Sequence, residues 1–183
     1  MTEASKNRRN GPLVLLAASL FVALAVWLRD GATEGVRGPA LGAYPELFVD
    51  VATCSPRGEA FRNGRRAEEL ALLRADRYAY NPRDGVRAVQ RYQEAEACYR
   101  LAGAERDAAR VRRSSSELSA RVDTDYAAAR LNLVNALEQD RWSDALSEIR
   151  RLLLLTEHLR RHEYVEWLEK NIGKAAARAS TSR

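Results

Sequence analysis

The order of hydrophobic and polar positions divides the chain into an apolar N-terminal run and a longer part with helical periodicity. Residues 13–28 read LVLLAASLFVALAVWL and contain no charge. Across residues 64–176, apolar positions recur at alternating spacings of three and four, the period of an amphipathic helix. All five prolines lie at or before Pro82. The pattern therefore predicts an all-α fold of about five to six helices behind a single N-terminal transmembrane helix and a linker.

The first two helices of the periodic part have recognisable boundaries. A helix over about residues 64–80 is predicted from the helical spacing of Ala67, Leu70, Leu73, Arg77 and Tyr80. Asn81-Pro82 ends it and starts the next helix, because Asn is a common N-cap and Pro is tolerated in the first turn. Gly103 is expected to close that second helix as its C-cap.

The later helices are less sharply bounded. Residues 104–139 contain neither proline nor glycine and form either one long helix or two. We place a break near Asp123, because short polar side chains compete for backbone hydrogen bonds there. Another helix follows Trp142, and the last carries residues 164–172. Fraying is expected from Gly173, and residues 177–183 are predicted to be a disordered tail.

Two of these helices carry a narrow stripe of small and bulky residues, which we call the seams. The first seam consists of Ala88, Tyr92, Ala95, Tyr99 and Ala102, and the second of Trp142, Ala145, Ile149 and Leu152. Small residues let a neighbouring helix approach closely, while the larger side chains fill the gaps between them. The seams are therefore predicted to pack helices together.

The spacing of both seams is similar to that of the second helix of the tetratricopeptide repeat, in which an aromatic, a small and further apolar residues recur in this order. The resemblance covers residues 64–176 at most. It implies an antiparallel array of helix hairpins with a groove for a peptide or partner helix, and it does not imply an enzyme. The alternative is an ordinary helical bundle whose seams serve only its own core.

The apolar run over residues 13–28 predicts a transmembrane signal anchor. As a helix it spans about 24 Å, and flanking basic residues can snorkel to reach the interfaces of a core of about 30 Å. Its main membrane-contacting side chains are Leu13, Leu16, Leu20, Phe21, Leu24, Trp27 and Leu28. A cleaved signal peptide ending at Ala23-Leu24-Ala25 is the alternative, which would leave a soluble periplasmic protein.

The basic residues before this run predict its orientation. Residues 1–12 contain Lys6, Arg8 and Arg9, and cationic flanks stay on the cytoplasmic side. Residues 1–12 should therefore be a cytoplasmic tail, and the body should lie beyond the inner membrane in a periplasm-like space. Residues 29–63, rich in glycine and proline, are predicted to be a linker with a short docked stretch around Leu47.

The two cysteines, Cys54 and Cys98, are the only ones in the chain. An even pair in an exported protein is a candidate disulfide, whereas two buried thiols would be expected in the cytosol. We expect the disulfide, which would join the irregular segment around Cys54 to the helix that carries Cys98.

The charge pattern and motifs argue against several functions. The net charge is +5, and basic and acidic residues alternate along the body, so no nucleic-acid site is indicated. His158 and His162 have the spacing of two zinc ligands on a helix, but solvated surface histidines are the preferred interpretation. No catalytic motif is recognised, and we predict no enzyme activity, cofactor or metal.

These observations predict a membrane-anchored interaction or scaffold module that binds other envelope proteins through a helical groove. Secretion, pilus, motility and polysaccharide complexes remain equally open, as does the oligomeric state. The alternative is a structural or signalling single-span protein that associates with itself and has no groove ligand.

Overall fold

The computed structural model describes residues 44–49, 52–159 and 161–181, which belong to one compact unit beginning at Gly38. The described residues form five α-helices and one short 3-10 helix and no strand, which confirms the all-α prediction. The helices are α2 (Ala60–Ala75), α3 (Pro82–Leu101), α4 (Glu105–Glu138), α5 (Trp142–Leu155) and α6 (Glu163–Thr181), with η1 (Glu157–Leu159) before α6.

The predicted cytoplasmic tail (1–12), the signal anchor (13–28) and most of the linker lie outside the described residues. Among the helices that the structure does describe, none combines the length and apolar character needed to cross a bilayer.

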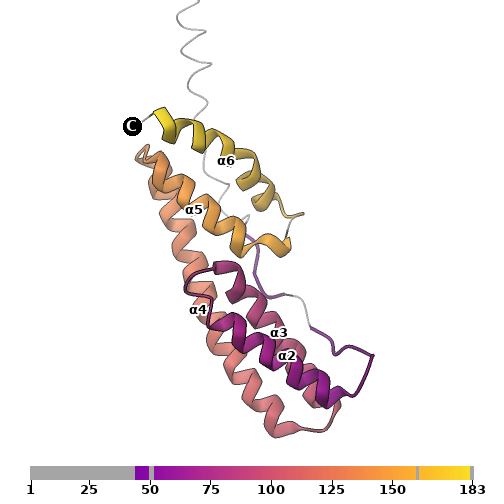
Figure 1. Cartoon of the computed structure of the whole chain (residues 1–183). Coiled ribbons are helices and arrows are strands. Elements are labelled where there is room, and N and C mark those ends of the chain that lie inside the picture. The colour runs from indigo at the N-terminus through magenta and orange to yellow at the C-terminus, as the bar shows by residue number, and fades with distance from the viewer. Residues whose placement is uncertain (1–43, 50–51, 160, 182–183) are drawn as a thin grey trace, which may run out of the picture. The chain divides into compact units, whose positions relative to one another are not determined.

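Each helix packs against the next one along the chain (Figure 1). The 34 residues of α4 give it a length of about 51 Å, and it is shared by two groups of helices. Its N-terminal half packs with α2 and α3, and its C-terminal half packs with α5 and α6. The helix α4 therefore joins two small hydrophobic cores.

The two cores differ in composition. Alanines and tyrosines dominate the core of α2, α3 and the first half of α4, which contains Ala67, Ala71, Tyr92, Ala95, Tyr99, Ala108 and Val111. Larger aliphatic side chains dominate the other core, where α5 contributes Ile149, Leu152 and Leu155. Small residues bring helices closer together, so the first core has little space for added atoms.

The position and buried face of α2 correct the sequence prediction. The helix begins at Ala60, within the predicted linker, and ends at Ala75 rather than at Tyr80. Its buried face carries Gly64, Ala67 and Ala71, while Leu70 and Leu73 are exposed. The cause is the close approach of α3, because a Cβ added at Gly64 would lie 2.9 Å from the ring of Tyr99.

The second helix has the predicted boundaries. Pro82 is its first residue, and Gly103 follows it with a left-handed φ of +72°. The N–H groups of Gly103 and Ala104 donate to the carbonyl oxygens of Arg100 and Tyr99, which is the Schellman pattern. Glycine adopts this conformation without steric strain and so ends α3 sharply.

The predicted break near Asp123 is wrong, because α4 is continuous from Glu105 to Glu138. The hydroxyl of Thr124 donates to the carbonyl oxygen of Ala120 at 2.8 Å, a hydrogen bond to residue i−4 that is typical of a threonine inside a helix. Val122 and Tyr126, on either side, are both buried. Packing on both sides of the polar stretch therefore maintains the helix.

The C-terminal helix also extends further than expected. The sequence predicts fraying from Gly173 and a disordered tail from residue 177, whereas α6 continues to Thr181. Ala175 is fully buried, and the guanidinium carbon of Arg178 lies 4.4 Å from the ring centroid of Trp142. Contacts with α5 thus stabilise the last turns of α6.

Candidate binding groove

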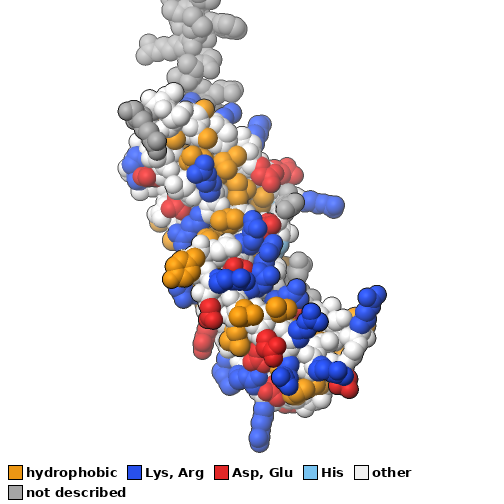
Figure 2. All heavy atoms as spheres, in the orientation of Figure 1, with side chains coloured by type: hydrophobic (Ala, Val, Ile, Leu, Met, Phe, Trp, Pro, Cys, Tyr) orange, Lys and Arg blue, Asp and Glu red, His pale blue; other side chains and the backbone are white. Residues whose placement is uncertain are grey.

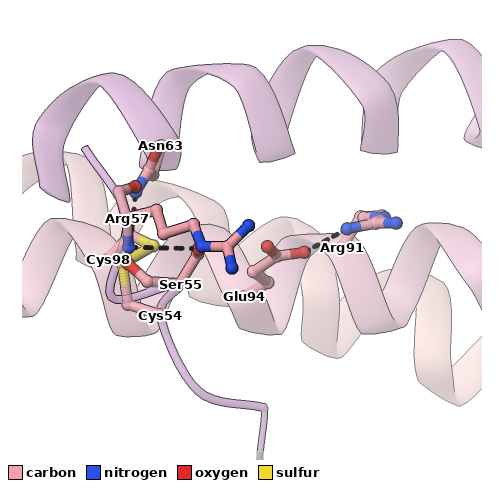
Figure 3. The surroundings of a disulfide bond; sticks show 7 residues. All are labelled: Cys54, Ser55, Arg57, Asn63, Arg91, Glu94 and Cys98. Carbon is pink, nitrogen blue, oxygen red and sulfur yellow. Dashed lines mark hydrogen bonds and ion pairs between the residues drawn. A yellow bond between two sulfur atoms is a disulfide. The ribbon is translucent and has the colours of Figure 1, made fainter. Parts of the chain in front are cut away.

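The disulfide between Cys54 and Cys98 is present, as the sequence predicts, with Cα atoms 4.7 Å apart. It joins the irregular segment before α2 to α3 (Figure 3). The Asn63 side-chain amide on α2 donates to the carbonyl oxygens of Ser55 and Arg57, at 3.2 and 2.7 Å. The disulfide and these hydrogen bonds fasten the segment to both helices.

The extended residues 44–49 pack against the helices at a second place. The side chain of Leu47 is buried, and its carbonyl oxygen lies 2.8 Å from Nε2 of His158. The ring of Tyr44 meets the ring of Tyr164 edge-on, with centroids 5.0 Å apart. The docked stretch around Leu47 that the sequence predicted is therefore part of the folded unit, although Val49 is exposed.

Two adjoining hollows lie along α3. The first, of about 490 Å³, is lined by Leu47, Phe48, Ala52 and Thr53 of the segment, Arg74 of α2, Arg87, Gln90, Arg91, Gln93 and Glu94 of α3, and His158. The second, of about 190 Å³, shares Arg87, Gln90 and His158 with it and adds Arg83, Val86, Leu154 and Glu157. We call the two hollows together the basic groove.

Positive charge exceeds negative charge in the lining of this groove, which has four arginines and two glutamates, although Arg74 is also paired with Asp84 at 2.6 Å. Arg83 and Arg87 share the carboxylate of Glu157, at 2.6 and 3.3 Å. Arg91 forms an ion pair with Glu94 (Figure 3). Because one carboxylate serves two guanidinium groups, the lining keeps an excess of positive charge, and its arginines remain partly exposed to solvent.

The register of α3 separates this groove from the core. Arg83, Arg87 and Arg91 follow one another at intervals of four residues and so lie on one side of the helix. The first seam occupies the adjacent face, about 100° around the helix, where Tyr92 and Tyr99 are buried. Sequence reasoning missed these arginines as a group, although their i, i+4, i+8 spacing was the signal that could have found them.

The structure places most seam residues in the two cores rather than in a groove. Ala88, Ala95, Ala145, Ile149 and Leu152 are fully buried, and Tyr92 and Tyr99 nearly so. Trp142 is half-buried, and Ala102 is exposed at the end of α3. The helix-packing residues and the groove-lining residues are thus different sets.

The two histidines are not on one helical face, because the chain between them leaves the α-helical path. His158 lies in the 3-10 helix η1 and contacts the carbonyl oxygen of Leu47. His162 precedes α6, and its Nδ1 accepts the N–H of Tyr164 at 3.1 Å. His158 is exposed, as the sequence predicts, and His162 is partly buried, and each also makes one contact with the backbone.

The face of the molecule shown in Figure 2 has no single patch of one charge among its described residues. On the face shown in Figure 2, basic side chains are spread over the helices, and hydrophobic side chains form small separate patches. The basic groove is distinguished by its shape and by the carboxylate of Glu157, which Arg83 and Arg87 share. No protein-family model matches the chain, and neither a curated protein nor a solved structure matches it.

Proposed function

We propose that this protein is an interaction module of the cell envelope whose basic groove binds an extended acidic segment of another envelope protein. The observation that carries the proposal is the lining of the groove. Arginines provide charge-assisted donors for carboxylates, and the amides of Gln90 and Gln93 can pair with a peptide backbone. The apolar side chains of Leu47, Phe48 and Leu154 can contact the apolar parts of the bound segment's side chains.

The cellular location belongs to the same proposal. The apolar run at residues 13–28 behind a basic tail is typical of a signal anchor with a cytoplasmic N-terminus. The disulfide between Cys54 and Cys98 fits an oxidising compartment. We therefore infer an inner-membrane protein with its helical body on the outer side, and a cleaved signal peptide would leave that body in the same compartment.

A tetratricopeptide-like array remains part of the proposal. The helix pairs α2–α3 and α4–α5 both pack closely, and each second helix carries a seam of the repeat-like spacing. The length of α4 departs from a regular array, because this one helix packs in both groups. We infer two unequal hairpins, α2–α3 and α4–α5, of which the second also packs against the first through the N-terminal half of α4.

The direct test is crosslinking in native membranes. A photoreactive amino acid at Gln90 should crosslink to a partner, and mass spectrometry should place the crosslink in an acidic segment. Arg87→Glu with Arg91→Glu should abolish that product, because reversed charges repel carboxylates. The matched control, Arg112→Glu with Arg113→Glu, changes the same number of charges on α4, outside the groove lining, and should retain it.

Two outcomes would count against the proposal. Crosslinks found only between copies of this chain would favour the self-associating alternative, which sedimentation of the purified protein would then measure. Equal loss in the groove variant and the control would show a dependence on net charge alone. A synthetic peptide of the crosslinked segment should also bind the purified protein, and the binding should weaken as salt is raised.

A further inference from the structure

A second site lies where the extended segment crosses α4 and α6. The guanidinium carbon of Arg130 is 4.2 Å from the ring centroid of Tyr44 and 4.6 Å from that of Tyr126. Contacts of this kind hold a cation over the faces of aromatic rings. No carboxylate among the described residues forms an ion pair with Arg130, so aromatic rings alone position its charge.

The polar atoms around Arg130 are incompletely paired. Among the described residues, the hydroxyl of Tyr126 and the Nε of Arg130 are buried without a hydrogen-bond partner. Tyr126 is only 4% exposed. Burial raises the pKa of Tyr126 to about 12, so its hydroxyl is a neutral donor near neutral pH. Buried donors without acceptors are rare in folded proteins, and an acceptor supplied by a bound molecule is one physical explanation for them.

A pocket of about 330 Å³ adjoins these donors. Tyr126 and Arg130 form one part of its lining, Pro45 and Phe48 provide apolar surface, and Glu46 and Asp123 contribute carboxylates. Burial and the charge of Glu46 raise the pKa of Asp123, so the two carboxylates lie close enough to repel each other. Neither forms an ion pair within the part of the chain that the structure describes.

The pocket thus presents opposite charges on one stripe of α4. Asp123 and Arg130 are seven residues apart, which corresponds to a rise of about 10 Å. A simple anion would be repelled by the carboxylates, and a simple cation by Arg130. A molecule with an ammonium at one end and a carboxylate at the other would be attracted at both places.

We propose that this pocket binds a small zwitterion of dipeptide size, with its carboxylate at Arg130 and Tyr126 and its ammonium at Glu46 and Asp123. The distance along α4 suits the separated termini of a dipeptide better than the adjacent charges of a single α-amino acid. The apolar surface of Pro45 and Phe48 accommodates a side chain of the ligand. The site is separate from the basic groove, although Leu47 and Phe48 line both.

The experiment is titration calorimetry of the full-length protein in detergent micelles, with alanyl-phenylalanine as the probe. The free dipeptide should bind, whereas its N-acetylated form and its C-terminal amide should each bind about tenfold or more weakly, because each loses one charge-assisted contact. The N-acetylated form tests the carboxylates at Glu46 and Asp123, and the amide tests Arg130.

Variants locate the site. Asp123→Asn and Arg130→Gln should weaken binding by a similar factor, and Tyr126→Phe by several-fold. Tyr126→Phe removes a hydroxyl that has no partner in the described part of the chain, so the variant should fold at least as stably. The matched control is Tyr92→Phe, because Tyr92 is also only 4% exposed but lies in the other core and does not line the pocket. It should leave the affinity unchanged.

The proposal is overturned if titrations at two temperatures detect no heat, released or absorbed, up to about 10 mM dipeptide, since the pocket would then hold only solvent. Equal affinities for the free and blocked dipeptides would also overturn it, as would equal effects of Tyr126→Phe and Tyr92→Phe. Binding that survives Arg87→Glu with Arg91→Glu would keep this site distinct from the basic groove, whereas loss of binding in that variant would place the dipeptide in the groove and refute the assignment.

Discussion

The contact between Gly85 and Tyr78 offers a sharp test of how α3 packs. A Cβ added at Gly85 would lie 2.5 Å from Cε2 and 2.9 Å from Cγ of the Tyr78 ring. That ring cannot move away freely, because Tyr78 is buried and its hydroxyl donates to the carboxylate of Asp125 on α4. We therefore expect Gly85→Ala to destabilise the fold, although alanine normally stabilises a helix.

The expected change in the free energy of unfolding is the difference between a steric cost and a gain in helix propensity. Adding a methyl group to a filled site destabilises by about 1–3 kcal/mol, and displacement of Tyr78 would also weaken a hydrogen bond to a charged group, worth about 1.5–3 kcal/mol. Against this, replacing glycine by alanine in a helix gains up to about 1 kcal/mol. The net expectation is a loss of about 1–3 kcal/mol, which corresponds to a melting temperature lower by several degrees.

The matched control is Gly173→Ala in α6, where an added Cβ has no atom within 4 Å. This variant should gain up to about 1 kcal/mol, so the same substitution should have opposite signs at the two positions. The measurement is urea unfolding followed by circular dichroism. The reasoning is refuted if Gly85→Ala is as stable as Gly173→Ala. In a Tyr78→Ala background the added methyl group has room, and Gly85→Ala should no longer destabilise.

Three further effects are expected. Replacing Cys54 and Cys98 by alanine opens a link across 44 residues and should lower the unfolding free energy by about 4 kcal/mol; the wild type under reducing conditions should show a similar urea midpoint. Asp140 follows α4 with φ +53°, so Asp140→Gly should raise the stability by about 1 kcal/mol, seen as a higher urea midpoint. Burial raises the pKa of Tyr99 and Tyr126 to about 12. Tyrosine in the unfolded chain ionises near pH 10. The stabilisation that these two neutral tyrosines give the folded state is therefore complete below about pH 10 and is lost as the pH rises through about 12. A pH series of urea midpoints should show that decline, shallower in Tyr126→Phe.

Local signals explain which parts of the fold the sequence could predict. Pro82 and Gly103 act through their own backbone conformations. Both ends of α3 could therefore be predicted without knowing which residues pack around them. The pairing of Cys54 with Cys98 followed from the number of cysteines and the expected compartment. The all-α class followed from periodicity, which needs only the order of residues.

The errors occurred where a distant element decides the outcome. Along α2, leucine spacing indicated one buried face, yet α3 packs on the face with Gly64 and Ala67, because only small residues fit beside the ring of Tyr99. In α4, the polar stretch around Asp123 predicted a break, but buried residues on both sides maintain the helix. The intrinsic helix propensity of individual residues has little effect on the structure when tertiary packing opposes it.

The candidate sites were harder to predict than the helices, because each combines segments that are far apart in the sequence. The arginine stripe of α3 becomes a groove only when His158 and four residues of the extended segment provide the facing side, namely Leu47, Phe48, Ala52 and Thr53. Arg130 becomes an isolated charge only because Tyr44, more than eighty residues earlier, covers it. Both sites therefore depend on the docking of residues 44–49, which the disulfide at Cys54 helps to hold near α3. If that docking is lost on reduction, peptide binding in the basic groove and dipeptide binding at Arg130 should weaken together, while the helical content changes little.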